Sequence, residues 1–160
     1  MKIIIVYFSL TGNTKKLAVK IYQFLKSKNL EVSLFELESK EKKSFLRNCI
    51  EAIINKRVPI EKIPPIENYG CIAIGTPIWA GKIPPLVKSF IKEIDISNKN
   101  IFLFTTYKSG FLKGKAMKEF VKLIEEEKGK IIGKIDIKGK KIDENMNLIR
   151  EEIEKCLKKL

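Results

Sequence analysis

Runs of consecutive apolar residues alternate along this chain with segments in which apolar residues recur every three or four positions. Continuous β-branched and aromatic runs are typical of strands buried on both faces, whereas the wider spacing is typical of helices that bury one face. The first run is 2–8, and the first helical spacing places Leu17, Ile21 and Leu25 within 13–28. We therefore predict that strands and helices alternate from the start of the chain.

The same two patterns continue to the last residues. Strands are predicted at Lys2–Phe8, Glu31–Leu37, Tyr69–Gly75, Asn100–Tyr107 and Lys130–Ile137. Helices are predicted at Asn13–Lys28, Ser44–Lys56, Leu86–Ile94, Gly114–Lys128 and Asp143–Leu160, with an irregular, proline-rich connection at 58–68. This alternation indicates an α/β protein, an open parallel sheet with helices on both faces, in which a ligand binds beyond the carboxyl ends of the strands.

Length and apolar content set the scale of the molecule. A chain of 160 residues with 44% hydrophobic residues fits a single domain, 1–160, because such a chain buries most of its apolar surface around one core. No apolar stretch reaches the roughly 20 residues that a bilayer-spanning helix needs. An apolar run follows Met1 and Lys2 at once, without the pattern of a secretory signal. We expect a cytoplasmic protein without membrane insertion, either a monomer or a weak homodimer.

Cysteine and histidine usage narrows the chemistry. Cys49, Cys71 and Cys156 lie far apart, which favours reduced, buried thiols over a disulfide framework or a zinc site. The chain has no histidine, which removes the commonest general base and every Ser-His or Cys-His nucleophile pair. We therefore predict neither a catalytic residue nor a metal site.

The charge balance is strongly basic. The net charge of +13 comes from 32 basic and 19 acidic residues, and only Arg47, Arg57 and Arg150 are arginine. A nucleic-acid-binding surface would be expected to use more arginine, whose planar fork matches phosphates and guanine edges. Because the lysines alternate with glutamates in segments such as 38–43, we interpret most of them as a solvated surface. An acidic partner protein is the functional alternative.

A hydroxyl-rich segment, Ser9-Leu10-Thr11-Gly12-Asn13-Thr14, joins the first predicted strand to the first predicted helix. Alternating hydroxyls, a glycine that permits close backbone approach and a helix N-terminus together surround a phosphate with neutral donors. A turn in which threonine or asparagine caps the helix is the alternative interpretation. No Gly-Lys-Ser/Thr closes the segment, so it is not a Walker-type phosphate loop.

The segment 9–14 resembles the flavodoxin phosphate loop, whose pattern is Ser/Thr-x-Thr-Gly-x-Thr. A second segment, Ile74–Pro85, resembles the loop after the third strand in short flavodoxin-like proteins. The alternating elements extend this likeness over essentially the whole chain. The resemblance implies a flavodoxin-like three-layer sandwich with a five-stranded parallel sheet in the order 2-1-3-4-5, and flavin mononucleotide (FMN) as the cofactor.

The resemblance also implies which residues hold FMN. The phosphate is expected to contact Ser9, Thr11, Gly12, Asn13 and Thr14. The isoalloxazine ring is expected to lie against Thr76, Pro77, Ile78, Trp79, Ala80 and Gly81, with the only tryptophan stacked on it. A third contact segment follows the fourth strand and contains Thr105, Thr106, Tyr107 and Gly110. This segment lacks the Asp-x-x-x-Tyr arrangement and the acidic surround of the best-known flavodoxins.

An electron-transfer protein is the favoured function, because the cofactor then performs the electron chemistry and the chain needs no acid or base. The redox partner is expected to be a protein, with an acidic surface as the complement to the basic chain. An NAD(P)H-dependent, FMN-containing reductase of quinones or similar acceptors is the alternative. A flavin-free interaction module with the same fold is a third hypothesis. The peptide between Ala80 and Gly81 is a candidate redox-sensitive partner for flavin N5, because glycine makes a change of backbone orientation inexpensive.

Overall fold

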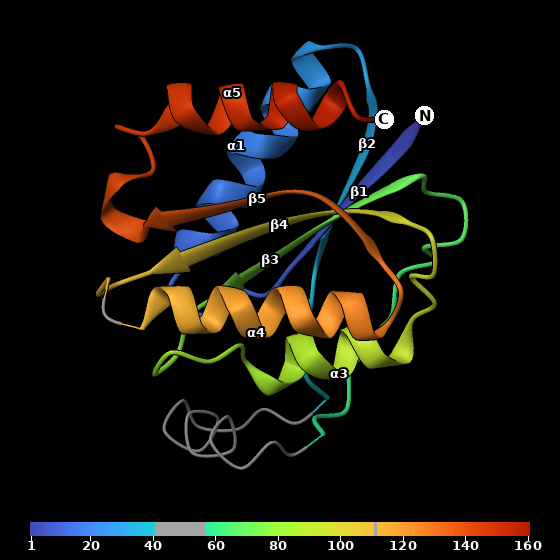
Figure 1. Cartoon of the computed structure of the whole chain (residues 1–160), viewed down its shortest axis with the longest axis vertical. Coiled ribbons are helices and arrows are strands. Elements are labelled where there is room, and N and C mark those ends of the chain that lie inside the picture. The colour runs from blue at the N-terminus through green and yellow to red at the C-terminus, as the bar shows by residue number, and fades with distance from the viewer. Residues whose placement is uncertain (41–56, 111) are drawn as a thin grey trace.

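The computed structural model describes residues 1–40, 57–110 and 112–160 (Figure 1). Its strands are β1 (Lys2–Tyr7), β2 (Glu31–Glu36), β3 (Cys71–Pro77), β4 (Asn100–Tyr107) and β5 (Lys130–Lys138). Its helices are α1 (Asn13–Ser27), α3 (Pro85–Glu93), α4 (Lys113–Glu126) and α5 (Met146–Leu157), with a short 3-10 helix, η1 (Gly139–Lys141). The predicted helix at 44–56 and the predicted buried thiol of Cys49 lie outside the described residues.

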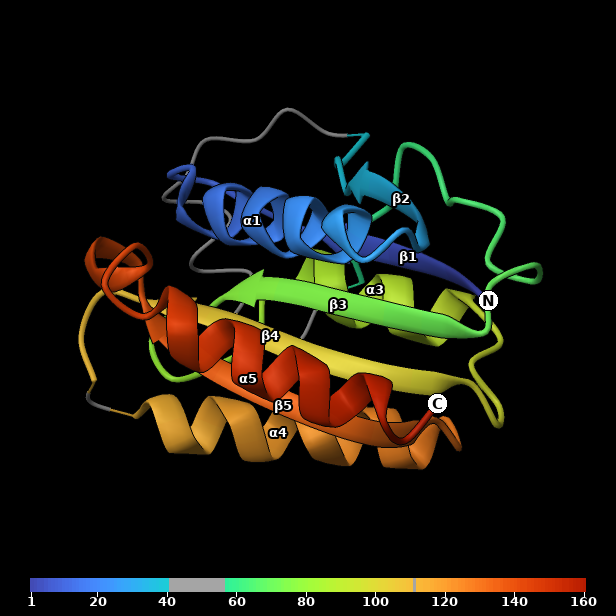
Figure 2. The same cartoon turned by 90° about the horizontal axis from the view of Figure 1, so that it is seen from above.

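The five strands form one parallel sheet in the order β2-β1-β3-β4-β5, as predicted. Figure 2 shows α1 and α5 on one face of the sheet and α3 and α4 on the other. After β1 the chain adds β2 on one side, and it then returns to add β3 on the other side of β1. The loops that follow β1 and β3 therefore diverge at the carboxyl ends of these strands, where open α/β sheets bind ligands.

Two apolar cores explain why the strands are continuous hydrophobic runs. On one face, Ile3 and Ile5 of β1 belong to the core that includes Leu17 of α1. On the other face, Ile4 and Val6 belong to the core that includes Phe90 of α3. Because successive strand side chains point to opposite faces, every position of a doubly covered strand is apolar.

Several element boundaries differ from those predicted. The strand β3 begins two residues later than expected and extends to Pro77. The last helix begins at Met146 rather than at Asp143, because η1 and a turn precede it. Asp143 forms ion pairs with Lys16 and Lys20 of α1, so its side chain anchors this turn to α1. No described helix has the length and apolar character that crossing a membrane requires.

Candidate functional site

A cavity of about 460 Å³ lies at the carboxyl ends of the strands, a volume typical of small-molecule sites. It is bordered by the loop after β1 and by the ends of β3, β4 and β5 with the residues that follow them, at the arrowhead end of the sheet in Figure 1. Its lining comprises Leu10, Thr11, Asn13, Pro77, Ile78, Trp79, Ala80, Thr106, Tyr107, Lys108, Lys138, Gly139 and Lys140. The lining is hydroxylic and amidic beside α1, apolar and aromatic after β3, and basic after β5.

The loop after β1 turns into α1 at Gly12, whose φ of 85° lies in the left-handed region that favours glycine. The first turn of α1 contains no acidic residue, so the helix itself places no carboxylate at the positive end of its dipole. The Lys15 N–H donates to Ser9 Oγ at 3.1 Å, and Asn13 Nδ2 donates to Thr11 Oγ1 at 3.3 Å. The Ser9 hydroxyl thus accepts from a first-turn N–H, while Thr11 and Asn13 line the cavity.

Thr14 points down into the protein rather than into the cavity. Its hydroxyl lies 2.8 Å from the hydroxyl of Thr106, and the two residues are 1% and 3% exposed. Thr106 lies near the end of β4 and also lines the cavity. This hydrogen bond therefore links the first turn of α1 to the end of β4, at a residue that lines the cavity.

The loop after β3 contains a tight turn at 79–82. Trp79 and Lys82 exchange two backbone hydrogen bonds, of 3.0 and 2.8 Å. Ala80 and Gly81 between them have φ values of 46° and 74°, the positive values of a type I′ turn. A Cβ atom at Gly81 would lie 2.7 Å from Cβ of Leu112, so both conformation and space require glycine there. The turn therefore packs directly against the start of α4.

Trp79 is held from outside the cavity by Phe8. The two ring centroids lie 5.5 Å apart with an interplanar angle of 76°, an edge-to-face contact. Trp79 is half-buried and lines the main cavity. The structure thus provides a fixed aromatic wall at one side of the cavity.

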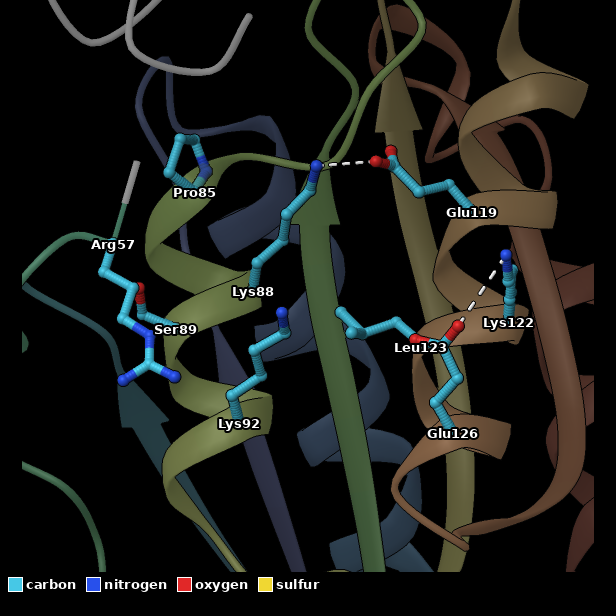
Figure 3. Close-up of a pocket in the computed structure, with 9 residues that line it drawn as sticks. All are labelled: Arg57, Pro85, Lys88, Ser89, Lys92, Glu119, Lys122, Leu123 and Glu126. Carbon is cyan, nitrogen blue, oxygen red and sulfur yellow. Dashed lines mark hydrogen bonds and ion pairs between the residues drawn. The ribbon is translucent and has the colours of Figure 1, made fainter. Parts of the chain in front are cut away.

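The carboxylate of Glu119 in α4 holds the end of the same loop. Its Oε2 accepts a hydrogen bond from the Ile83 backbone N–H at 3.0 Å, and its Oε1 lies 2.6 Å from the Lys88 ammonium. Figure 3 shows this ion pair reaching from α3 to α4. The Lys88 side chain is only 14% exposed, whereas that of Glu119 is 33% exposed, so the lysine is the more shielded partner of the pair. Glu119 therefore couples the loop after β3 to both helices on that face.

The groove between α3 and α4, drawn in Figure 3, has a volume of about 290 Å³. Its lining is dominated by charged side chains, among them Arg57, Lys92, Lys122 and Glu126. Lys122 pairs with Glu126 at 3.7 Å, and Lys88 pairs with Glu119 across the top of the groove. The groove offers no aromatic wall and lies along helices rather than at the strand ends, so the cavity of about 460 Å³ is the better candidate for a flat ring.

The end of β4 contributes Thr106 and Tyr107 to the cavity lining, whereas Thr105 is engaged by the neighbouring strand. The Thr105 hydroxyl donates to the carboxylate of Asp136 in β5, and Thr105 is fully buried. Tyr107 lines the cavity, and the Lys113 ammonium lies 4.9 Å from its ring centroid and 3.3 Å from its hydroxyl. The ammonium therefore covers part of the Tyr107 ring. Lys108, the next residue, also lines the cavity.

The structure brings eight of the predicted site residues to the cavity lining: Thr11, Asn13, Pro77, Ile78, Trp79, Ala80, Thr106 and Tyr107. The others belong to the same loops and strand ends but do not line it: Ser9, Gly12, Thr14, Thr76, Gly81, Thr105 and Gly110. The Thr76 hydroxyl, for example, donates to the carbonyl of Pro77 at 3.1 Å in a fully buried position.

Sequence reasoning missed one wall of the cavity, formed by Lys138, Gly139 and Lys140. Two lysines therefore share the cavity lining with Thr11 and Asn13, which belong to the loop predicted to offer neutral donors to a phosphate. The available signal was the segment Lys-Gly-Lys-Lys at 138–141, directly after the fifth predicted strand. Its relevance depends on how η1 packs, which no local pattern reveals.

Comparison with known proteins gives one family and several similar folds. A family model described as Flavodoxin matches residues 2–149. Among curated proteins, an uncharacterized protein of Methanocaldococcus jannaschii is 34% identical over 82 residues, which cover 50% of this chain and 55% of that protein. The match therefore spans about half the length of that relative.

Solved structures of similar fold cover nearly the whole chain. A flavoprotein from Lactobacillus acidophilus NCFM, crystallised in complex with FMN, is 21% identical, with a TM-score of 0.71 and coverage of 89% of this chain and 97% of that one. Oxidised flavodoxin 2 from Bacillus cereus is 21% identical, with a TM-score of 0.66 and full coverage of both chains. At these identities the likeness establishes the shared fold.

Proposed function

This chain belongs to the flavodoxin family, and we propose that it binds FMN in the cavity at the carboxyl ends of its strands and carries electrons with it. One observation carries the proposal: a single cavity joins the hydroxyl and amide groups of Thr11 and Asn13 to the aromatic turn at 79–82. A phosphate and a flat ring system need these two environments side by side.

The residues present fit FMN in both size and chemistry. The volume of about 460 Å³ lies within the range of sites that hold small ligands. Trp79, Ile78 and Pro77 supply apolar surface for a flat ring, and Thr11 and Asn13 supply neutral polar groups beside the α1 N-terminus. The complex of the similar Lactobacillus acidophilus flavoprotein with FMN supports the same cofactor here.

When bound, FMN supplies reversible uptake of electrons. The chain positions the cofactor. Trp79 is fixed by Phe8 and forms one wall, while the bond between Thr14 and Thr106 keeps the α1 N-terminus at the cavity floor. The Ala80–Gly81 peptide lies in a turn with positive φ at both residues, so its N–H and carbonyl are proposed to orient the ring edge.

An electron carrier is favoured over an FMN-dependent reductase because the cofactor then performs the electron chemistry and the chain needs no catalytic acid or base. The net charge of +13 and the position of Lys108 in the cavity lining support an acidic redox partner. Opposite charges accelerate the encounter of two proteins and make its rate fall with salt. We propose that electrons pass between this chain and a partner of that kind.

The test begins with the absorbance spectrum of the purified protein and a titration with FMN, followed by quenching of flavin fluorescence. Binding with a micromolar or tighter dissociation constant supports the proposal. Trp79→Leu is expected to weaken FMN binding, whereas Tyr22→Leu, in α1 outside the cavity lining, leaves it unchanged. Protein that neither carries nor binds FMN contradicts the proposal and favours the flavin-free interaction module.

A second assay separates carrier from reductase. The FMN-loaded protein is mixed with NADH or NADPH in the presence of a quinone, and flavin reduction is followed by absorbance. Absence of turnover, together with reduction by a reduced electron-transfer protein, supports the carrier. Steady turnover with either nucleotide contradicts the carrier and assigns the NAD(P)H-dependent reductase.

A further inference from the structure

The wall formed by Lys138, Gly139 and Lys140 lies against the start of α1. A Cβ atom at Gly139 would lie 2.6 Å from Nδ2 and 2.7 Å from Cγ of Asn13, so the backbone of η1 contacts the first residue of that helix. The lysines on either side of Gly139 line the same cavity as Thr11 and Asn13. Two cationic side chains thus border the part of the cavity that has the phosphate-binding pattern.

The neighbouring charges leave this wall basic. Asp143 pairs with Lys16 and Lys20 of α1, and Lys141 pairs with Glu144 at 3.4 Å. The described lining contains three lysines and no acidic side chain. The positive end of the α1 dipole adds to the same field. An anion at this end of the cavity is therefore favoured by charge as well as by neutral donors.

The wall is also fixed in place. Ile142, directly after η1, is fully buried in the core that includes Leu17 and Ile149. The ion pairs of Asp143 with Lys16 and Lys20 tie the same segment to α1. The backbone that follows Lys140 is thus held by the core and by α1, which reduces the entropy cost of ordering this segment around a ligand.

Building on the proposed function, we propose that Lys138 and Lys140 hold the FMN phosphate by charge, together with the neutral loop at 9–14. The family pattern in that loop supplies neutral donors only. With lysines added, the affinity for FMN falls as salt rises, whereas the affinity for riboflavin, which lacks the phosphate, does not. The lysines therefore act as specificity determinants for the phosphorylated flavin.

The test compares the dissociation constants of FMN and riboflavin, measured by flavin fluorescence at about 0.05 and about 0.5 M salt. Between these two concentrations the Debye length falls from about 14 Å to about 4 Å, so charge interactions are screened much more strongly at the higher one. K138Q/K140Q is expected to bind FMN about tenfold more weakly than the unchanged chain at low salt, and to lose most of its salt dependence. Its affinity for riboflavin is expected to change by less than about twofold. K138R/K140R, which keeps both charges, is expected to retain FMN.

The control is K155Q/K158Q, which removes one charge from the last turn of α5 and one from the residue directly after it, both outside the cavity lining. It is expected to leave both affinities unchanged. The inference is overturned if K138Q/K140Q binds FMN and riboflavin more weakly by the same factor. It is also overturned if this variant binds FMN as tightly as the unchanged chain does. Loss of affinity for NADPH with FMN unaffected also overturns it, because the lysines then serve another phosphate. If the unchanged chain fails to bind FMN, the proposed function itself fails.

Discussion

The side-chain hydroxyls of Thr14 and Thr106 lie 2.8 Å apart, although 92 positions separate these residues in the chain. Thr14 belongs to the first turn of α1, and Thr106 lies near the end of β4. Both are buried, so each hydroxyl depends on the other for a hydrogen bond inside the protein. The start of α1 cannot move away from the sheet without leaving two polar groups unsatisfied.

Thr14→Val is therefore expected to lower the free energy of unfolding by about 1–3 kcal/mol, because the Thr106 hydroxyl loses its buried hydrogen-bond partner. The double variant T14V/T106V is expected to lose less than the sum of the two single variants. Urea unfolding of the four proteins measures this coupling, and strictly additive losses would contradict it.

Thr11→Val, at an exposed position in the cavity lining, should weaken FMN binding with little effect on stability.

The Glu119 carboxylate supports the loop after β3 through the Ile83 N–H and the Lys88 ammonium. Glu119→Leu removes both interactions and leaves Lys88 poorly solvated, so we expect a loss of about 1–3 kcal/mol in unfolding free energy and weaker FMN binding. Glu119→Gln keeps an acceptor for the N–H and should lose less. Glu126→Leu, in the exposed pair with Lys122 on the same helix, is the matched control. Similar effects of E126L and E119L on FMN affinity would argue against a special role for Glu119.

The turn at 79–82 places an alanine where glycine is preferred. Ala80 has a φ of 46°, so Ala80→Gly is expected to relieve strain and to raise the unfolding free energy by up to about 1 kcal/mol. Gly81→Ala is expected to destabilise the protein, because its Cβ would lie 2.7 Å from Cβ of Leu112. Thermal unfolding measures both changes. A stabilising G81A variant would show that the turn does not pack on Leu112 in solution.

Lys16 and then Lys20 lower the pKa of Asp143 below its ordinary value, by hydrogen bonds and by charge. A lowered folded-state pKa contributes stability above the unfolded-state pKa of about 3.9, and this contribution disappears as pH falls through the folded-state value. Asp143→Asn should therefore lower the urea midpoint at pH 7, and its difference from the unchanged chain should shrink below about pH 4. A difference that persists undiminished at pH 2 would contradict the ion pairs. Glu144→Gln, in the neighbouring exposed pair with Lys141, serves as the control.

Lys108 lines the cavity, and its charge favours a reduced flavin that carries negative charge. Lys108→Gln is expected to make the midpoint potential of the bound FMN more negative, by on the order of tens of millivolts. Redox titration of the two proteins measures the shift. Lys92→Gln, in the groove between α3 and α4, is the control with the same change of charge. An unchanged or less negative potential in K108Q would contradict this effect.

The alternation of strands and helices was predictable because each strand is covered on both faces, which makes every residue from Ile3 to Val6 apolar. The loops at 9–14 and 76–81 were predictable because their residues form compact local patterns. Thr105 and Thr106, both expected to contact FMN, are neighbours on β4, so their side chains point to opposite faces of the sheet. One donates to Asp136 and the other meets Thr14.

The basic wall at 138–140 was not predictable from local sequence. This wall forms because β5 ends where η1 can pack against Asn13. The contact between Gly139 and Asn13 joins residues 126 positions apart and depends on the register of the sheet. The start of α5 was also misplaced, because Asp143 is used for ion pairs with α1 rather than for the first helical turn. Tertiary contacts determine the position of the basic wall and the first residue of α5, whereas local periodicity determines which segments form strands and helices.

Trp79, which contacts Phe8, is the only tryptophan in the chain, and this has a practical consequence. All indole emission of the protein originates from one ring at the cavity wall. A flavin that enters the cavity accepts that excitation energy at short range, so occupancy can be followed from the unlabelled protein alone. The same signal, read during unfolding, reports when this wall separates from the end of β1.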